Sequence, residues 1–205
     1  MPQKSIHAIL FDFGGVLAEE GFRNGLMALA REQGLDEAQM PTVGMQAVYD
    51  SGFVVGQGKA ADFWQLLRQR SGLQGDDASL SERILEGFIP RPWMLQLVMH
   101  LKTQGYITGI LSDQTNWLDL LDRRHHLYQH FDHIYNSYYL GKGKRDPSLF
   151  RDIATTLRLA PEAILFIDDD AGNVARARQA KLQAIHYVDK ASFLSELNTV
   201  LESTA

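Results

Sequence analysis

The chain has 205 residues, of which 45% are hydrophobic and 22% are charged, a composition typical of globular proteins. It contains no cysteine, which excludes disulfide scaffolds, thiolate zinc sites and cysteine nucleophiles. Its 20 basic and 25 acidic side chains give a net charge of −5, so nucleic acid is a poor candidate partner.

The first predicted element is a buried strand over residues 6–11, an apolar run that leads directly into Asp12. Residues 17–89 differ, because they show apolar spacings of three and four, many glycines and no strand pattern. This segment of about 70 residues is much longer than the dozen or so that a crossover connection needs. We therefore predict a small inserted helical domain over 17–89, with hinges at 17–21 and 88–92; ordinary crossover helices are the alternative.

Strands and helices alternate over the remainder of the chain. Further buried strands are predicted at residues 106–111, 131–135, 163–167 and 184–188. Helices are predicted at 93–104, from Asp146 and Pro147 onward, and at 173–181. This alternation predicts an α/β fold, a doubly wound parallel sheet of the Rossmann-like kind, built from residues 1–16 and 90–205.

Polar residues gather where four of the predicted strands end. In an open α/β sheet, ligands bind outside the carboxyl ends of the strands. The residues at these ends are Asp12, Gly14 and Gly15; Ser112 and Asp113; Lys144; and Asp168 and Asp169. The topology is expected to bring them to one edge.

This set of residue types favours phosphoryl transfer to an aspartate. Asp12 is the natural nucleophile, and Asp168 and Asp169 would join it in a hard oxygen cage suited to Mg²⁺. The transfer brings an anionic nucleophile to an anionic phosphate, so positive charge is needed.

Phosphate contacts are expected from the other strand ends. Ser112 lies at an expected helix start, where its hydroxyl and nearby N–H groups would hold phosphate oxygens. Lys144 would add positive charge opposite the metal, and Gly14 and Gly15 would give a tight turn that lets backbone amides approach.

Each residue also has a structural explanation. Asp12 or Ser112 could be a helix cap. Lys144 could be a solvated loop charge, in which case Lys142 or Arg145 would contact the phosphate instead. The run of residues 168–170 could be a solvated turn. Asp170 is the residue in that run expected to cap the next helix. Asn173 either ties the metal-side loop together or opens the helix.

The four groups, in this order, resemble the motifs of the haloacid dehalogenase-like hydrolase superfamily. The stretches that carry the resemblance are Asp12-Phe13-Gly14-Gly15-Val16, Ser112, Gly141-x-x-Lys144-x-Asp146, and Asp168-Asp169 with Asn173 beyond. Within this superfamily, the sequence resembles the branch that contains the α-D-glucose-1-phosphate phosphatases and the N-terminal phosphatase domain of soluble epoxide hydrolase. The resemblance implies that residues 17–89 form a helical cap domain.

The resemblance also implies a mechanism. Asp12 would form an aspartyl-phosphate that water then hydrolyses, while Ser112 and Lys144 bind the phosphate. Mg²⁺ would be held by Asp12, the Gly14 carbonyl and Asp169, with Asp168 bound directly or through water.

The chain departs from the family pattern at two positions. Gly14 stands where the family has a second aspartate, a general acid/base that typically contributes about 10²–10⁴-fold. We hypothesise that Asp113 partly substitutes, the alternative being that it caps a helix. Arg145 stands where a proline usually follows the motif lysine.

Other groups of residues are expected to be structural. His126 and His130 would share a face if their segment were helical, but no carboxylate pattern joins them. Phe63 and Trp64 are expected in the core, and Arg23 on a solvated face, with substrate contact as the alternative for all three.

The function we expect is a Mg²⁺-dependent phosphatase that acts on a small phosphorylated metabolite, such as a sugar phosphate. The alternatives are a 2-haloacid dehalogenase, a receiver-like phospho-Asp domain and a non-catalytic regulatory member. No apolar run approaches the ~18 residues of a membrane span. We expect a cytoplasmic protein with no membrane partner, as a monomer or a small homo-oligomer.

Overall fold

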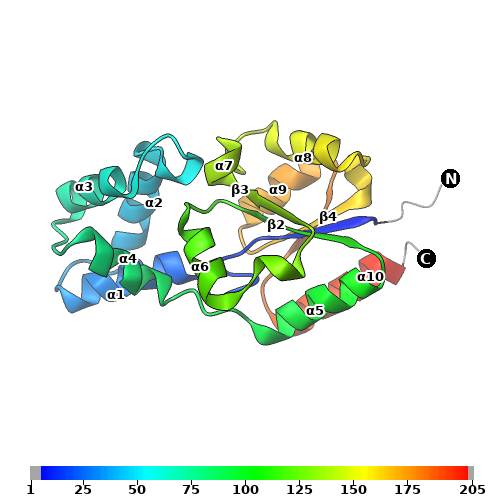
Figure 1. Cartoon of the computed structure of the whole chain (residues 1–205), viewed down its shortest axis with the longest axis horizontal. Coiled ribbons are helices and arrows are strands. Elements are labelled where there is room, and N and C mark those ends of the chain that lie inside the picture. The colour runs from blue at the N-terminus through cyan, green and yellow to red at the C-terminus, as the bar shows by residue number, and fades with distance from the viewer. Residues whose placement is uncertain (1–5, 203–205) are drawn as a thin grey trace.

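Five strands form one parallel sheet in the computed structural model, which describes residues 6–202 (Figure 1). The order across the sheet is β3-β2-β1-β4-β5, so β1 lies at the centre. The strands are β1 (Ala8–Phe11), β2 (Ile107–Ser112), β3 (His133–Asn136), β4 (Ile164–Asp168) and β5 (Gln183–His186). This confirms the predicted parallel α/β fold, and each strand end lies within two residues of its prediction.

Both faces of the sheet are covered, which explains why the inner strands β1 and β4 are almost continuously apolar. Side chains alternate along β1, so that Ile9 and Phe11 enter one apolar cluster while Ala8 and Leu10 enter the other. Helices α5 (Pro92–Thr103) and α10 (Lys190–Glu202) cover the first face, and α8 (Leu149–Leu157) and α9 (Ala171–Gln179) cover the second (Figure 1).

Three helix starts differ from the predicted ones by two residues or more. Helix α8 begins at Leu149 and not at Pro147, because the Asp146 carboxylate accepts the Ser148 N–H at 2.8 Å and forms a separate turn. Helix α9 begins at Ala171, with Asp170 as its cap, as expected for that residue. Helix α6 (Trp117–His125) begins well beyond Ser112, so Ser112 is a strand end and not a helix start.

Between β1 and β2 the chain forms helices that pack on one another beside the sheet (Figure 1). They are α1 (Gly21–Glu32), α2 (Met40–Asp50), α3 (Ala60–Ser71) and α4 (Asp77–Leu85), with the short helix η1 (Phe53–Val55).

The two segments that connect these helices to the sheet lie side by side. Glu19 N–H donates to the Ile89 carbonyl at 2.9 Å, and Arg91 N–H donates to the Leu17 carbonyl at 2.8 Å. The Arg91 guanidinium also donates to the Gly15 carbonyl at 2.6 Å. The chain therefore enters and leaves the helices at one place, within the segments predicted as hinges.

An aromatic cluster joins these helices to the sheet region. Trp117 of α6 lies edge-on to Phe53 and Phe63, with ring centroids 5.6 and 6.0 Å apart, and Trp64 is 6.1 Å away. All four belong to the apolar cluster that continues onto the sheet. Phe63 and Trp64 are thus core residues, and the cluster links the two parts of the chain.

Short elements complete the described range: α7 (Ser137–Leu140), η2 (Tyr128–His130) and η3 (Pro161–Ala163). Helix α6 ends at His125, and His126 has a φ of 52°, so His126 and His130 do not share a helix face. Every helix within residues 6–202 falls short of the length and apolarity needed to cross a membrane.

We expect Trp64→Ala to lower the free energy of unfolding by about 3–5 kcal/mol, because it empties a large, fully buried site in the shared cluster. Val188→Ala, at a side chain that is 69% exposed, should change it by less than about 0.5 kcal/mol. Urea unfolding of both variants would test this; equal values would show that the cluster does not support the fold.

Candidate active site

The strand ends place several polar side chains at one edge of the sheet. Ser112, the last residue of β2, pairs in register with Asn136 of β3, and Asp168, the last residue of β4, pairs with His186 of β5. Asp12 follows β1 between them, its N–H donating to the Ile167 carbonyl at 2.8 Å. The order of the sheet thus brings the groups that contain Asp12, Ser112 and Asp168 to one edge, as the sequence predicts.

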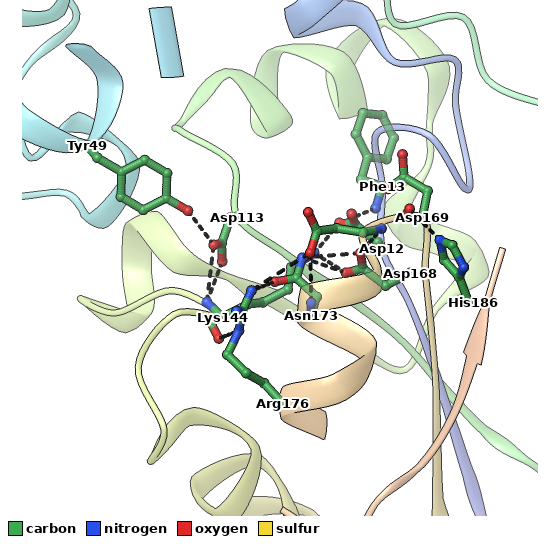
Figure 2. A network of polar contacts seen from close by, with 11 residues as sticks. Asp12, Phe13, Tyr49, Asp113, Lys144, Asp168, Asp169, Asn173, Arg176 and His186 are labelled. Atoms are coloured by element: carbon green, nitrogen blue, oxygen red, sulfur yellow. Dashed lines mark hydrogen bonds and ion pairs between the residues drawn. The ribbon is translucent and has the colours of Figure 1, made fainter. Parts of the chain in front are cut away.

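Lys144 lies at the centre of this edge and is 1% exposed (Figure 2). Its Nζ is 2.9 Å from Oδ1 of Asp12 and 2.6 Å from Oδ2 of Asp168. Lys142, the other candidate, instead pairs with Asp152 and with Ser148 Oγ at the edge of α8. The loop between α7 (Ser137–Leu140) and α8 therefore brings Lys144, not Lys142, to the Asp12 carboxylate.

The buried charges alter one another's protonation. Burial alone would lower the pKa of Lys144, but the carboxylates of Asp12, Asp168 and Asp113 raise it well above its usual range, so the lysine stays charged. Burial raises the pKa of Asp12, and Lys144 and the Ser112 hydroxyl offset only part of that rise. Burial and the Asp12 charge raise the pKa of Asp168 to about 6.

Asp168 is held on several sides. Besides Lys144, it accepts the Asp170 N–H at 2.8 Å and the Asn173 side-chain amide at 3.1 Å on each oxygen. Arg176 of α9 donates to the Lys144 carbonyl at 2.9 Å, which ties the lysine loop to the same helix. Asn173 therefore holds the loop after β4, one of the two roles considered for it.

Three carboxylates come close enough to hold a metal ion. Asp12, Asp168 and Asp169 each offer an oxygen, and these oxygens lie within 4.8 Å of one another. Burial and the neighbouring Asp168 raise the pKa of Asp169. Such clustered carboxylates repel one another, and a divalent cation with oxygen ligands would relieve this repulsion, so the donor set fits Mg²⁺.

Gly15 makes room for the Asp169 carboxylate. Its φ is +82°, and a Cβ built on it would lie 2.1 Å from Oδ2 of Asp169. No side chain fits at this position unless Asp169 moves. The predicted tight turn is present, but what its glycine allows here is the close approach of a carboxylate.

Asp113 connects three parts of the structure (Figure 2). Its carboxylate accepts the Lys144 N–H at 2.9 and 3.1 Å and the Tyr49 hydroxyl at 2.7 Å. Tyr49 comes from α2, and its ring packs under the Arg145 guanidinium, 3.9 Å from the centroid. Asp113 does not cap α6, whose N-cap is Asn116.

Glu20 adds a carboxyl group from the start of α1. Its Oε2 accepts the Arg23 N–H at 2.7 Å. Burial, followed by the charges of Asp169 and Asp12, raises the pKa of Glu20 to about 7, although the Arg23 N–H opposes the rise. No motif in the sequence singles out Glu20.

A cavity of about 630 Å³ opens between the sheet edge and the helices of residues 21–85. Asp12, Ser112 and Lys144 line one side, and Phe22, Met45 and Tyr49 are among the residues lining the other. Arg23 also lines it, whereas Phe63 and Trp64 do not. The cavity therefore combines an ionic floor with a mixed apolar and basic wall.

Comparison with known proteins identifies the family of this chain. The family model described as haloacid dehalogenase-like hydrolase matches residues 6–181. The bifunctional epoxide hydrolase 2 of Rattus norvegicus is 36% identical over 119 residues, which is 55% of this chain and 21% of that protein. The chain thus spans about a fifth of the length of this curated relative.

Solved structures with the same fold include two enzymes with bound molecules. A HAD family enzyme from Bacteroides thetaiotaomicron, in complex with magnesium and inorganic phosphate, has a TM-score of 0.75 and 18% identity over 93% of this chain and 99% of that one. An L-2-haloacid dehalogenase from Xanthobacter autotrophicus, with chloropropionic acid covalently bound, has a TM-score of 0.63 and 19% identity, covering 95% and 83%.

We expect Mg²⁺ to raise the melting temperature, and more so at pH 7.5 than at pH 5. The raised pKa of Asp168, about 6, and those of Asp12 and Asp169 mean that the folded state binds more protons than the unfolded state. Metal-free stability therefore falls as the pH rises from about 4 through 6. Mg²⁺ would take the place of these protons. At a Mg²⁺ concentration 100 times its dissociation constant, binding would add about 2.7 kcal/mol to the free energy of unfolding.

Thermal melts with and without Mg²⁺ at the two pH values would measure this gain. Asp169→Asn should abolish it, while Asp50→Asn, at an exposed carboxylate paired with Arg70, should keep it. An undiminished gain in Asp169→Asn would locate the metal elsewhere.

Gly15→Ala should destabilise the fold and remove the Mg²⁺-dependent gain, because the new methyl group displaces Asp169. Gly34→Ala is the matched control: its φ is +67°, but no atom lies within 4 Å of the added Cβ. It should cost only the conformational strain, about 1–2 kcal/mol. If both variants lost the same stability and both responded to Mg²⁺, the contact with Asp169 would not matter.

Proposed function

The chain belongs to the haloacid dehalogenase-like hydrolase family, and we propose that it is a Mg²⁺-dependent phosphatase acting on a small phosphorylated metabolite, such as a sugar phosphate. The observation that carries this proposal is the contact of Lys144 with Asp12 beside the Asp169 carboxylate. A nucleophile, a fixed cation and a metal-binding carboxylate then surround one point at the cavity floor.

Asp12 is the proposed nucleophile. Its Oδ1 accepts the Phe13 N–H at 2.7 Å and faces Lys144, so this oxygen is fixed and the carboxylate is oriented. The other oxygen is the one we assign to attack on phosphorus. The phosphorus–oxygen bond to the leaving group breaks as the aspartyl-phosphate forms, and water then hydrolyses this acyl phosphate to release phosphate.

The surrounding residues would hold the phosphate and balance its charge. We assign phosphate contacts to the Lys144 ammonium, the Ser112 hydroxyl and the backbone N–H groups near Gly14, Gly15 and Asp113. Asp12, the Gly14 carbonyl and Asp169 would hold Mg²⁺, with Asp168 bound directly or through water. When bound there, Mg²⁺ would reduce the repulsion between Asp12 and the substrate phosphate.

Asp168 has a second proposed task, since it keeps Lys144 in place. Asn173 and the Asp170 N–H donate hydrogen bonds to the Asp168 carboxylate and orient it. The oriented carboxylate pairs with the Lys144 ammonium. A lysine held in this way approaches the phosphate without first losing the freedom of a long side chain.

Residues 17–89 are proposed to act as a cap domain over the core domain of residues 1–16 and 90–205. The cavity supports this role, because its wall comes from α1 and α2 while its floor comes from the sheet edge. Helix α2 supplies Met45, Val48 and Tyr49, which would select the substrate's leaving group. A cavity of about 630 Å³ suits a small metabolite.

The carboxylate cluster supports phosphatase chemistry over dehalogenation. A 2-haloacid dehalogenase attacks carbon and needs no metal, so it has no use for Asp168 and Asp169 as a pair. A receiver-like domain has its acidic pair after the first strand, whereas here it follows β4. Mg²⁺-dependent phosphate release from a panel of sugar phosphates, nucleotides and acyl phosphates would test the proposal; halide release without Mg²⁺ would contradict it.

Asp12→Asn should lower phosphatase activity by about 10³-fold or more, because the amide does not act as the nucleophile. The variant should still fold, because Asp168 remains as an ion-pair partner of the buried Lys144 and one of the three clustered carboxylates is gone. Steady-state phosphate release and a thermal melt measure the two effects. Asp50→Asn provides the control with unchanged activity, and appreciable turnover by Asp12→Asn would remove Asp12 from its assigned role.

A further inference from the structure

The position two residues after Asp12 has no side chain that could transfer a proton. A Cβ built on Gly14 would lie 3.2 Å from Cε1 of Phe88, 3.6 Å from Oε1 of Glu20 and 3.7 Å from Nε2 of Gln114. The space beside Gly14 is therefore bordered by a carboxyl oxygen that comes from the start of α1.

The local structure of Glu20 orients this oxygen. Glu20 is the N-cap of α1, and its Oε2 accepts the Arg23 N–H at 2.7 Å, as capping side chains do. The other oxygen, Oε1, accepts no hydrogen bond from any residue in the range 6–202. The cap thus fixes one oxygen and leaves the other facing Gly14.

Glu20 also lies at the proposed reaction site. It lines the cavity together with Asp12 and Asp169. A carboxyl group at this point can give a proton to a leaving group and take one from water, which is what acid/base catalysis requires.

The other carboxylates that line the cavity have other partners. Asp113 accepts the Lys144 N–H and the Tyr49 hydroxyl, and Asp170 accepts the Asn173 N–H as the cap of α9. Asp169 lies against Gly15 in the candidate metal cluster. Asp113, suggested by the sequence for proton transfer, is therefore better suited to positioning the lysine loop and Tyr49.

We propose that Glu20 is the general acid/base of this site and takes the place of the aspartate that is absent at position 14, an inference that rests on the proposed phosphatase function. As Asp12 attacks, the breaking bond leaves its electron pair on the leaving-group oxygen, which takes the proton from Glu20. Glu20, now a carboxylate, then takes a proton from the water that attacks the aspartyl-phosphate. The bond to Asp12 breaks, its electron pair returns to the Asp12 carboxylate, and phosphate leaves.

Two aryl phosphates of similar shape would test the acid step with Mg²⁺ present. p-Nitrophenyl phosphate releases a weakly basic phenolate that needs little protonation, whereas phenyl phosphate releases a more basic one. In Glu20→Gln, kcat/KM should fall about 10²-fold or more for phenyl phosphate and less than about tenfold for p-nitrophenyl phosphate. The base step predicts a burst of p-nitrophenol followed by slow turnover, because the aspartyl-phosphate accumulates.

A second variant separates catalysis from folding. Glu20→Ser also removes the carboxyl group but keeps a good N-cap for α1, so it should fold and should show the same dependence on the leaving group. Glu19→Gln is the matched control, since Glu19 is exposed, pairs with Arg91 and does not line the cavity. It should behave as the wild type does.

The outcomes distinguish this inference from the function on which it rests. Equal losses for the two substrates in both Glu20 variants, with no burst, would overturn the role of Glu20 while wild-type phosphate release upholds the phosphatase. A leaving-group effect in Asp113→Asn and not in the Glu20 variants would assign the proton transfer to Asp113. No Mg²⁺-dependent phosphate release by the wild type would refute the proposed function, and this inference with it.

Discussion

The buried ion pairs of Lys144 are the interaction on which the site depends. A lysine that is 1% exposed is tolerable only because two carboxylates lie within 3 Å of its Nζ. Those carboxylates belong to the ends of two neighbouring strands, β1 and β4, and the lysine belongs to the loop between α7 and α8. One cation therefore fixes three separate chain segments, and the position of Asp12 follows from it.

This arrangement has a cost in stability. Asp12, Asp168 and Asp169 lie together with raised pKa values, and together with Glu20 their charge exceeds what Lys144 alone balances. If this site binds Mg²⁺ and a phosphate as proposed, it has to hold unbalanced charge before they arrive. The continuous apolar cluster around Trp64 and Trp117 supplies the stability that this strain requires.

The sequence predicts the strands well because both faces of the sheet are buried, which leaves a mostly apolar run for the inner strands; the edge strands β3 and β5 are the least apolar. It also predicts Asp12, Ser112, Asp168 and Asp169 at one edge, because the ends of parallel strands meet there. It does not distinguish Lys144 from Lys142, since the loop conformation decides which lysine turns inward. Glu20 gives no signal at all: two consecutive glutamates before a helix suggest only a cap, and its nearness to Gly14 exists only in three dimensions.

The pairing of the two connecting segments has a consequence for how such chains diversify. Because residues 17–19 and 89–91 are hydrogen-bonded to each other, the helices between them begin and end at the same point of the core. The segment between these two connections can become longer or shorter, or be replaced as a unit, without changing the spacing of β1 and β2. The proposed reaction centre and the proposed substrate-selecting surface can then evolve at different rates, with the restriction that any replacement has to cover the apolar surface around Trp117.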